Sequence, residues 1–144
     1  METATLNDLI EVLDDGRKFY EEAASQVGRE DLKILFARMA RTKEAIVNDL
    51  RTAVIARGEN PSEGGSWAGA ARKAYADVRV MLSSDKTYAY IAELEGFEDR
   101  ILQAFRDAAV HADDPTVAAL VDRYMKEVNR DHAQMSNLKH LHAA

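Results

Sequence analysis

Cysteine is absent from this chain of 144 residues, and glycine and proline together number only nine. Without cysteine the chain forms no disulfide, no thiol nucleophile and no cysteine-ligated zinc or iron–sulfur site. Because glycine and proline are the residues that interrupt regular structure, their scarcity leaves long uninterrupted stretches. The absences therefore favour an all-helical protein.

Long apolar runs and an excess of positive charge are also missing. The run Val117–Val121 has five residues and no apolar run is longer, whereas a membrane span needs roughly 20. The first residues show neither a basic stretch nor an apolar signal segment, so we expect a cytoplasmic protein that does not enter a membrane. With 25 acidic and 19 basic residues the net charge is −6, which makes nucleic acid an unfavourable partner.

Apolar residues recur every three or four positions along most of the chain, which predicts amphipathic helices. Start and stop residues divide the pattern into stretches, with Thr5 and Asp114 as N-caps and Gly28 and Gly58 as stops. The length favours one domain over residues 1–144. The predicted helices cover approximately residues 5–27, 30–57, 67–82 and 85–110, and a last one begins at Pro115.

The lengths of the connections predict how the helices are arranged. Only a few residues separate the first two helices, and a few separate the last two, so each pair is predicted to be an antiparallel hairpin. The segment at about 58–84 joins the hairpins and contains the fifth, shorter helix, so it is long enough to travel the length of a bundle. These features predict a ferritin-like four-helix bundle. A plain up-and-down bundle with an added helix remains the alternative.

Polar side chains interrupt the apolar face of every long helix near its middle, when the sequence is projected at about 100° per residue. One interpretation is a buried ion-pair layer that sets the helix register, in which Arg17 and Lys43 face Glu98 and Glu95. The members of this predicted polar layer are Arg17, Lys43, Glu98, Asp131 and His132.

The alternative interpretation is a metal site between the helices, made from carboxylates and an imidazole as in di-iron bundles. Its candidate ligands are Glu21, Glu44, Glu95, Glu98 and His132, for iron or manganese. Two positions depart from the Glu-x-x-His pattern of such sites. Val47 stands where a histidine is required three residues after Glu44, and Asn129 stands where an acid is required three residues before His132. The ion-pair interpretation, with no cofactor, is therefore preferred.

Several motifs together resemble a bacterial family of ferritin-like four-helix bundles of unknown function, over nearly the whole chain. They are Phe19-Tyr20-Glu21-Glu22-Ala23-Ala24, Gly58-Glu59-Asn60-Pro61, Gly65-Ser66-Trp67-Ala68-Gly69, Glu95-x-x-Glu98 and the late His132. The resemblance implies a ferritin-like fold in a small cytosolic protein, and it implies no reaction.

Two classes of function follow from these observations. The preferred one is a non-enzymatic structural, assembly or stress-associated module; the alternative is a metal-dependent oxidase or an iron-handling protein. We expect a second copy or another protein as partner, and the third long helix offers Tyr90, Phe97 and Gly96 as a candidate dimer surface. The tyrosines, Tyr20 among them, are interpreted as core aromatic residues with hydroxyls in contact with water.

Overall fold

The computed structural model describes residues 2–63, 78 and 83–143, and within them every regular element is an α-helix. The helices are α1 (Glu2–Gln26), α2 (Glu30–Ala56), α4 (Ser83–His111) and α5 (Pro115–Ala143). The prediction of an all-helical chain is confirmed. The shorter helix predicted at about 67–82 lies outside the described residues, of which only Val78 falls in that range.

Local sequence signals explain most of the helix ends. Gly58 follows α2 with a φ of 76° and donates its N–H to the Ile55 carbonyl, a left-handed end that suits glycine. Asp114 caps α5 by accepting the N–H of Thr116 at 2.8 Å, with Pro115 at the first helical position. By contrast, α1 begins at Glu2, so the cap predicted at Thr5 is wrong.

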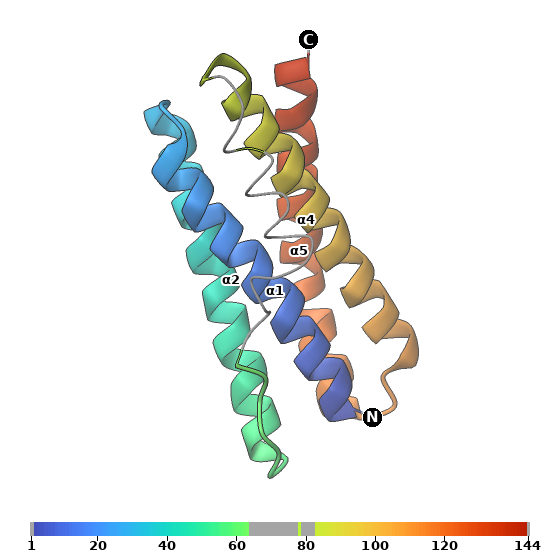
Figure 1. Cartoon of the computed structure of the whole chain (residues 1–144). Coiled ribbons are helices and arrows are strands. Elements are labelled where there is room, and N and C mark those ends of the chain that lie inside the picture. Colours follow the sequence, from blue (N-terminus) through green and yellow to red (C-terminus); the bar gives the residue numbers. More distant parts are fainter. Residues whose placement is uncertain (1, 64–77, 79–82, 144) are drawn as a thin grey trace.

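Figure 1 shows the four helices side by side, with α1 and α2 antiparallel and α4 and α5 antiparallel. The end of α2 lies at one end of the bundle and the start of α4 at the other, so α2 and α4 run in the same direction. The connection between the hairpins therefore joins opposite ends of the bundle. Its first residues turn back along α1, where the Ser62 N–H donates to Asn7 Oδ1 at 2.8 Å and the Ser62 hydroxyl to Glu11 at 3.1 Å.

The core consists of two apolar clusters stacked along the bundle. One lies around residues 6–13 of α1 and 46–54 of α2, and the other around residues 19–27 of α1 and 32–40 of α2. Both continue into α4 and α5, and Lys43, Glu98 and Asp131 are buried at the level between them. The polar residues therefore separate two halves of one core.

Tyr90 and Phe97 lie in the second cluster and not on a free surface. Their exposed fractions are 0% and 1%, and both rings pack on Phe19, at centroid distances of 5.6 Å and 5.1 Å. The sequence pattern suggested an exposed surface because these side chains lie beside the main apolar face of α4. In the structure α1 of the same chain covers them. The dimer surface predicted from these two side chains is wrong.

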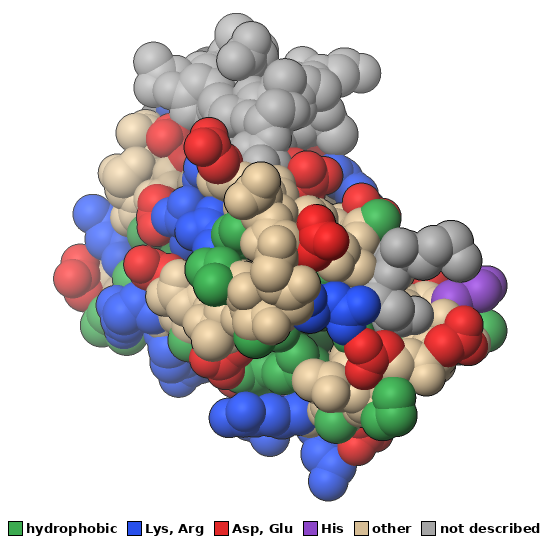
Figure 2. Space-filling view, turned by 90° about the horizontal axis from the view of Figure 1, so that it is seen from below, with side chains coloured by type: hydrophobic (Ala, Val, Ile, Leu, Met, Phe, Trp, Pro, Cys, Tyr) green, Lys and Arg blue, Asp and Glu red, His purple; other side chains and the backbone are tan. Residues whose placement is uncertain are grey.

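Among the described residues, no helix combines the length and the apolar character that crossing a membrane requires. At the end of the bundle that holds the α4–α5 turn, positive and negative side chains are interspersed, with small apolar groups between them (Figure 2).

Candidate functional site

One polar side chain from each helix meets at the centre of the bundle: Tyr20 of α1, Lys43 of α2, Glu98 of α4 and Asp131 of α5. We call these four the central polar cluster. The Lys43 ammonium lies 2.6 Å from Glu98 Oε1 and 3.2 Å from Asp131 Oδ2. The Tyr20 hydroxyl donates to the same Glu98 oxygen at 2.8 Å, and the Lys43 nitrogen lies 4.9 Å from the centre of the Tyr20 ring.

The central polar cluster is closed to solvent. The exposed fractions are 0% for Glu98 and Tyr20 and 1% for Lys43, while Asp131 reaches 7%. Burial raises the pKa of Glu98 although the Lys43 ammonium opposes the shift. Burial, helped by the neighbouring Glu98 charge, raises the pKa of Tyr20 well above its usual value, so its hydroxyl stays protonated as a donor.

The two carboxylate oxygens of Glu98 differ in their hydrogen-bond partners. Both Lys43 and Tyr20 bind Glu98 Oε1, whereas Oε2 has no hydrogen-bond partner among the described residues. A buried carboxylate oxygen without a partner is costly. The ion pair is therefore expected to add little net stability, although loss of Lys43 alone would leave a buried negative charge.

Gly16 of α1 provides the space for the Ile101 side chain of α4. A Cβ at this position would lie 3.1 Å from Ile101 Cδ1 and 3.8 Å from Lys43 Cδ and Cε. Such a contact with Ile101 is tight enough to require a local shift. A glycine here lets α1 lie close to Ile101 of α4, whereas the Lys43 methylenes would be at ordinary contact distance even from a Cβ.

Arg17 does not reach Glu98, contrary to the ion-pair network predicted from the sequence. Its guanidinium binds two carboxylates on its own helix, Asp14 at 2.7 Å and Glu21 at 2.8 Å. Both partners lie within one turn, at spacings of three and four residues, so Arg17 pairs locally at the half-buried edge of α1. Glu44 is exposed on α2. The candidate metal ligands Glu21 and Glu44 are therefore not part of the central polar cluster.

A second polar group lies on the outer face of α4 and α5 and contains Glu95, Asp99 and His132. Ligand atoms of the three lie within 4.8 Å of one another, and His132 Nε2 contacts Asp99 Oδ1. Lys139 lies 3.5 Å from Glu95. We call Glu95, Asp99 and His132 the outer triad; it contains two residues that the sequence suggested as ligands and one, Asp99, that it did not.

Two functional contacts were missed by the sequence interpretation. The sequence predicted that the Tyr20 hydroxyl contacts water. In the structure this hydroxyl is buried and donates to Glu98. The available signal was its place on the inward face of α1, one turn from the interruption of the apolar pattern. For Asp99 the signal was the spacing of four residues from Glu95, which puts both carboxylates on one face of α4.

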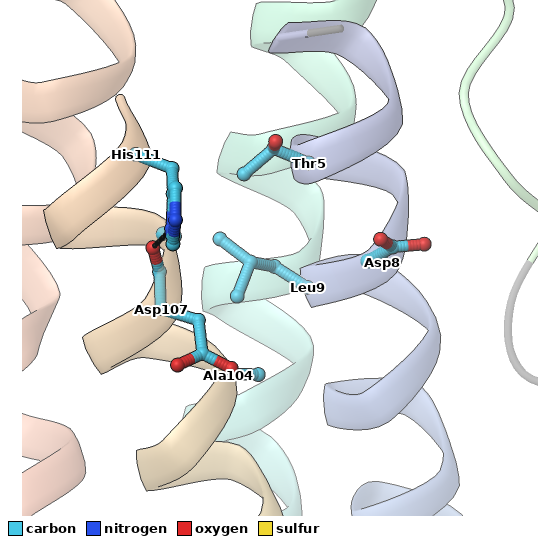
Figure 3. A pocket seen from close by; sticks show the side chains of 7 residues that line it. Thr5, Asp8, Leu9, Ala104, Asp107 and His111 are labelled. Carbon is cyan, nitrogen blue, oxygen red and sulfur yellow. Dashed lines mark hydrogen bonds between the residues drawn. The ribbon is translucent and has the colours of Figure 1, made fainter. Parts of the chain in front are cut away.

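A surface pocket lies between the start of α1 and the end of α4 (Figure 3). His111 Nδ1 contacts the Asp107 carbonyl of its own helix at 2.9 Å, and Asp8 points away from α4. The floor is apolar, from Leu9, Ala104 and Ala108. Because its polar groups do not converge on one point, this pocket is a weaker candidate than either cluster above.

Asp15 of α1 provides a pH-dependent element outside the central polar cluster. Burial raises its pKa from 3.8 to about 6, with Asp14 and Glu11 adding to the shift and Lys18 and Arg100 opposing it. A carboxyl whose pKa is higher in the folded state contributes to stability at pH values below its unfolded-state pKa. That contribution is lost as the pH rises through its folded-state pKa. The fold therefore gives up this contribution between about pH 4 and pH 6.

We expect Asp15→Asn to remove this dependence. The unfolding free energy of the variant relative to the original protein should rise between about pH 4 and pH 6 and be level at higher pH, because the amide never acquires the buried charge. Urea unfolding at several pH values measures the difference. A difference that does not change with pH would contradict the assignment.

Comparison with known protein families places most of the chain in one family. A family model described as a domain of unknown function (DUF2383) matches residues 1–110. No curated protein and no solved structure matches the chain. The matched residues include Tyr20, Lys43 and Glu98 of the central polar cluster and stop before α5, which carries Asp131 and His132.

Proposed function

We propose that this chain, which belongs to the DUF2383 family of domains of unknown function, is a non-enzymatic ferritin-like bundle that serves as a structural or assembly module. The ferritin-like assignment is supported by the connectivity: two antiparallel hairpins whose joining segment links opposite ends of the bundle. One long crossover of this kind is characteristic of ferritin-like folds.

The observation that carries the proposal is the Lys43 ammonium at the centre of the bundle. A di-iron or di-manganese bundle holds its cations at this level with carboxylates from all four helices. Here a cation of the protein itself is already bound to Glu98 and Asp131. The third neighbour, Tyr20, presents a protonated hydroxyl with a raised pKa.

The remaining residues do not fit a two-metal centre either. Glu21 is held by Arg17 on the surface, and Glu44 is exposed. The positions of the two required histidines offer only His132, which lies in the outer triad. A dication placed beside the Lys43 ammonium would be repelled, so the donor set favours a structural role for the central polar cluster.

That structural role is to select one alignment of the four helices. Only the alignment that places Lys43, Glu98 and Asp131 at one level pairs the buried charges, and a slipped alignment would leave them unpaired. The end of the bundle that holds the α4–α5 turn presents a surface of mixed charge (Figure 2), which suits a protein partner, either a second copy or a different chain, better than a nucleic acid. The module works in the cytoplasm.

Aerobic oxidation of ferrous iron tests the proposal. We expect no oxidation above the protein-free rate, either in the original protein or in Glu98→Gln, because the centre offers no pair of metal ions. His132→Ala serves as the matched control, since it changes the outer triad and leaves the centre intact. Iron oxidation that is present in the original protein, retained in His132→Ala and lost in Glu98→Gln would overturn the proposal in favour of an oxidase.

A further inference from the structure

We propose that the outer triad, Glu95, Asp99 and His132, is a site for a single divalent metal ion, with zinc as the favoured ion. It lies outside the central polar cluster and uses none of its side chains. The inference goes beyond the structural function proposed above, and its failure leaves that proposal intact.

The positions of the donors support this site. Glu95 and Asp99 are four residues apart and share a face of α4, and His132 approaches them from α5. One ligand atom of each lies within 4.8 Å of the other two. Around an ion bound at about 2.1 Å, ligand atoms are about 3–4 Å apart, so small rotations of the three side chains would bring the donors to this spacing.

The charges of the triad also call for a cation. Two carboxylates with a neutral imidazole carry a charge that matches a dication, and the Glu95 side chain is only 15% exposed. Lys139 approaches Glu95 at 3.5 Å with its own side chain 38% exposed. That cation neutralises one carboxylate at the edge of the group, and its flexible side chain is free to leave when an ion binds between the donors.

The donor types favour zinc over magnesium or calcium. One imidazole and two carboxylates form a mixed nitrogen and oxygen set, which suits zinc and other late first-row ions, whereas magnesium and calcium prefer oxygen alone. With three protein ligands, water fills the remaining coordination position. The site is open on the surface, so an ion enters without any movement of the helices.

On α4 and on α5, a residue of the outer triad directly follows a residue of the central polar cluster in the sequence. Glu98 and Asp131 point inward to Lys43, while the next residues, Asp99 and His132, point outward and contact each other. An ion in the outer triad would therefore clamp α4 to α5 at the level that the central polar cluster occupies. A ligand that binds only the folded state raises the stability of that state. An ion bound here would therefore stabilise the hairpin formed by α4 and α5.

Calorimetric titration of the full chain with zinc at neutral pH tests the site. We expect one equivalent to bind to the original protein, and His132→Ala and Asp99→Asn to weaken the affinity at least about tenfold, which is the smallest loss seen when even an indirect partner of a metal ligand is removed. His140→Ala is the matched control, because His140 lies exposed on the same helix outside the triad. This control should bind like the original protein.

Cobalt absorption distinguishes the site from adventitious binding. The visible bands of bound cobalt should appear with the original protein and with His140→Ala, and be absent with His132→Ala. Equal zinc affinity in the original protein and His132→Ala, or no binding at high micromolar zinc, would overturn the inference.

Discussion

Lys43→Met is expected to lower the free energy of unfolding by about 3–5 kcal/mol. The apolar side chain preserves most of the volume but leaves Glu98, which is 0% exposed, with only the Tyr20 hydroxyl as partner. The deficit should shrink as the pH falls, because burial already raises the pKa of Glu98 and protonation removes the unpaired charge. Urea unfolding across the acid range measures both effects.

The double variant Lys43→Met/Glu98→Leu is the informative companion. Replacing both charges by apolar groups avoids their desolvation, so part of the lost stability should return, and the two substitutions should be strongly coupled. The recovery is incomplete because Asp131 loses Lys43 and the Tyr20 hydroxyl loses Glu98. Lys126→Met, at an exposed position of α5, is the matched control and should change stability by less than about 0.5 kcal/mol. Additive losses in the double variant would contradict a direct ion pair.

Phe19→Ala is expected to cost about 3–5 kcal/mol by removing a fully buried ring from the second apolar cluster. Phe19 packs on Tyr90 and Phe97, so it joins α1 to α4 and is one of the contacts between the two hairpins. The cavity would weaken the association of the hairpins more than either hairpin itself. Thermal and urea unfolding of the variant give the magnitude.

Ile34→Ala is the control for Phe19→Ala. Ile34 also lies on a long helix but is 62% exposed, so its truncation should leave stability within about 0.5 kcal/mol of the original. A loss below about 1 kcal/mol for Phe19→Ala would indicate that the hairpins do not pack through this ring.

The helical elements were largely predictable because their signals are local. The spacing of apolar residues, the glycine after α2 and the pair Asp114-Pro115 act within a few residues of the structure that they specify. The start of α1 was missed for the same reason, since a polar residue such as Thr5 can cap a helix or continue it. Projection on a helix also placed Lys43 and Glu98 on inward faces, because that projection needs no knowledge of a neighbour.

The pairing of charges was harder to predict, as Arg17 shows. By projection both Arg17 and Lys43 point toward the core, and the projection does not tell which one reaches Glu98. In the structure Arg17 finds Asp14 and Glu21 on its own helix, whereas Lys43 reaches Glu98 and Asp131 on two others. A long, flexible side chain takes the nearest partner, and the nearest partner depends on how the helices lie.

The amino-acid sequence by itself therefore determined the helical class of this protein and the inward position of Lys43, Glu98 and Asp131, because helix periodicity is a property of one segment. Only the tertiary structure decided which residues meet: Lys43 with Glu98 and Asp131 inside, and Glu95 and Asp99 with His132 outside. These contacts join positions separated by tens of residues. They depend on the alignment of α2, α4 and α5 along the bundle, which packing sets once the whole core is assembled.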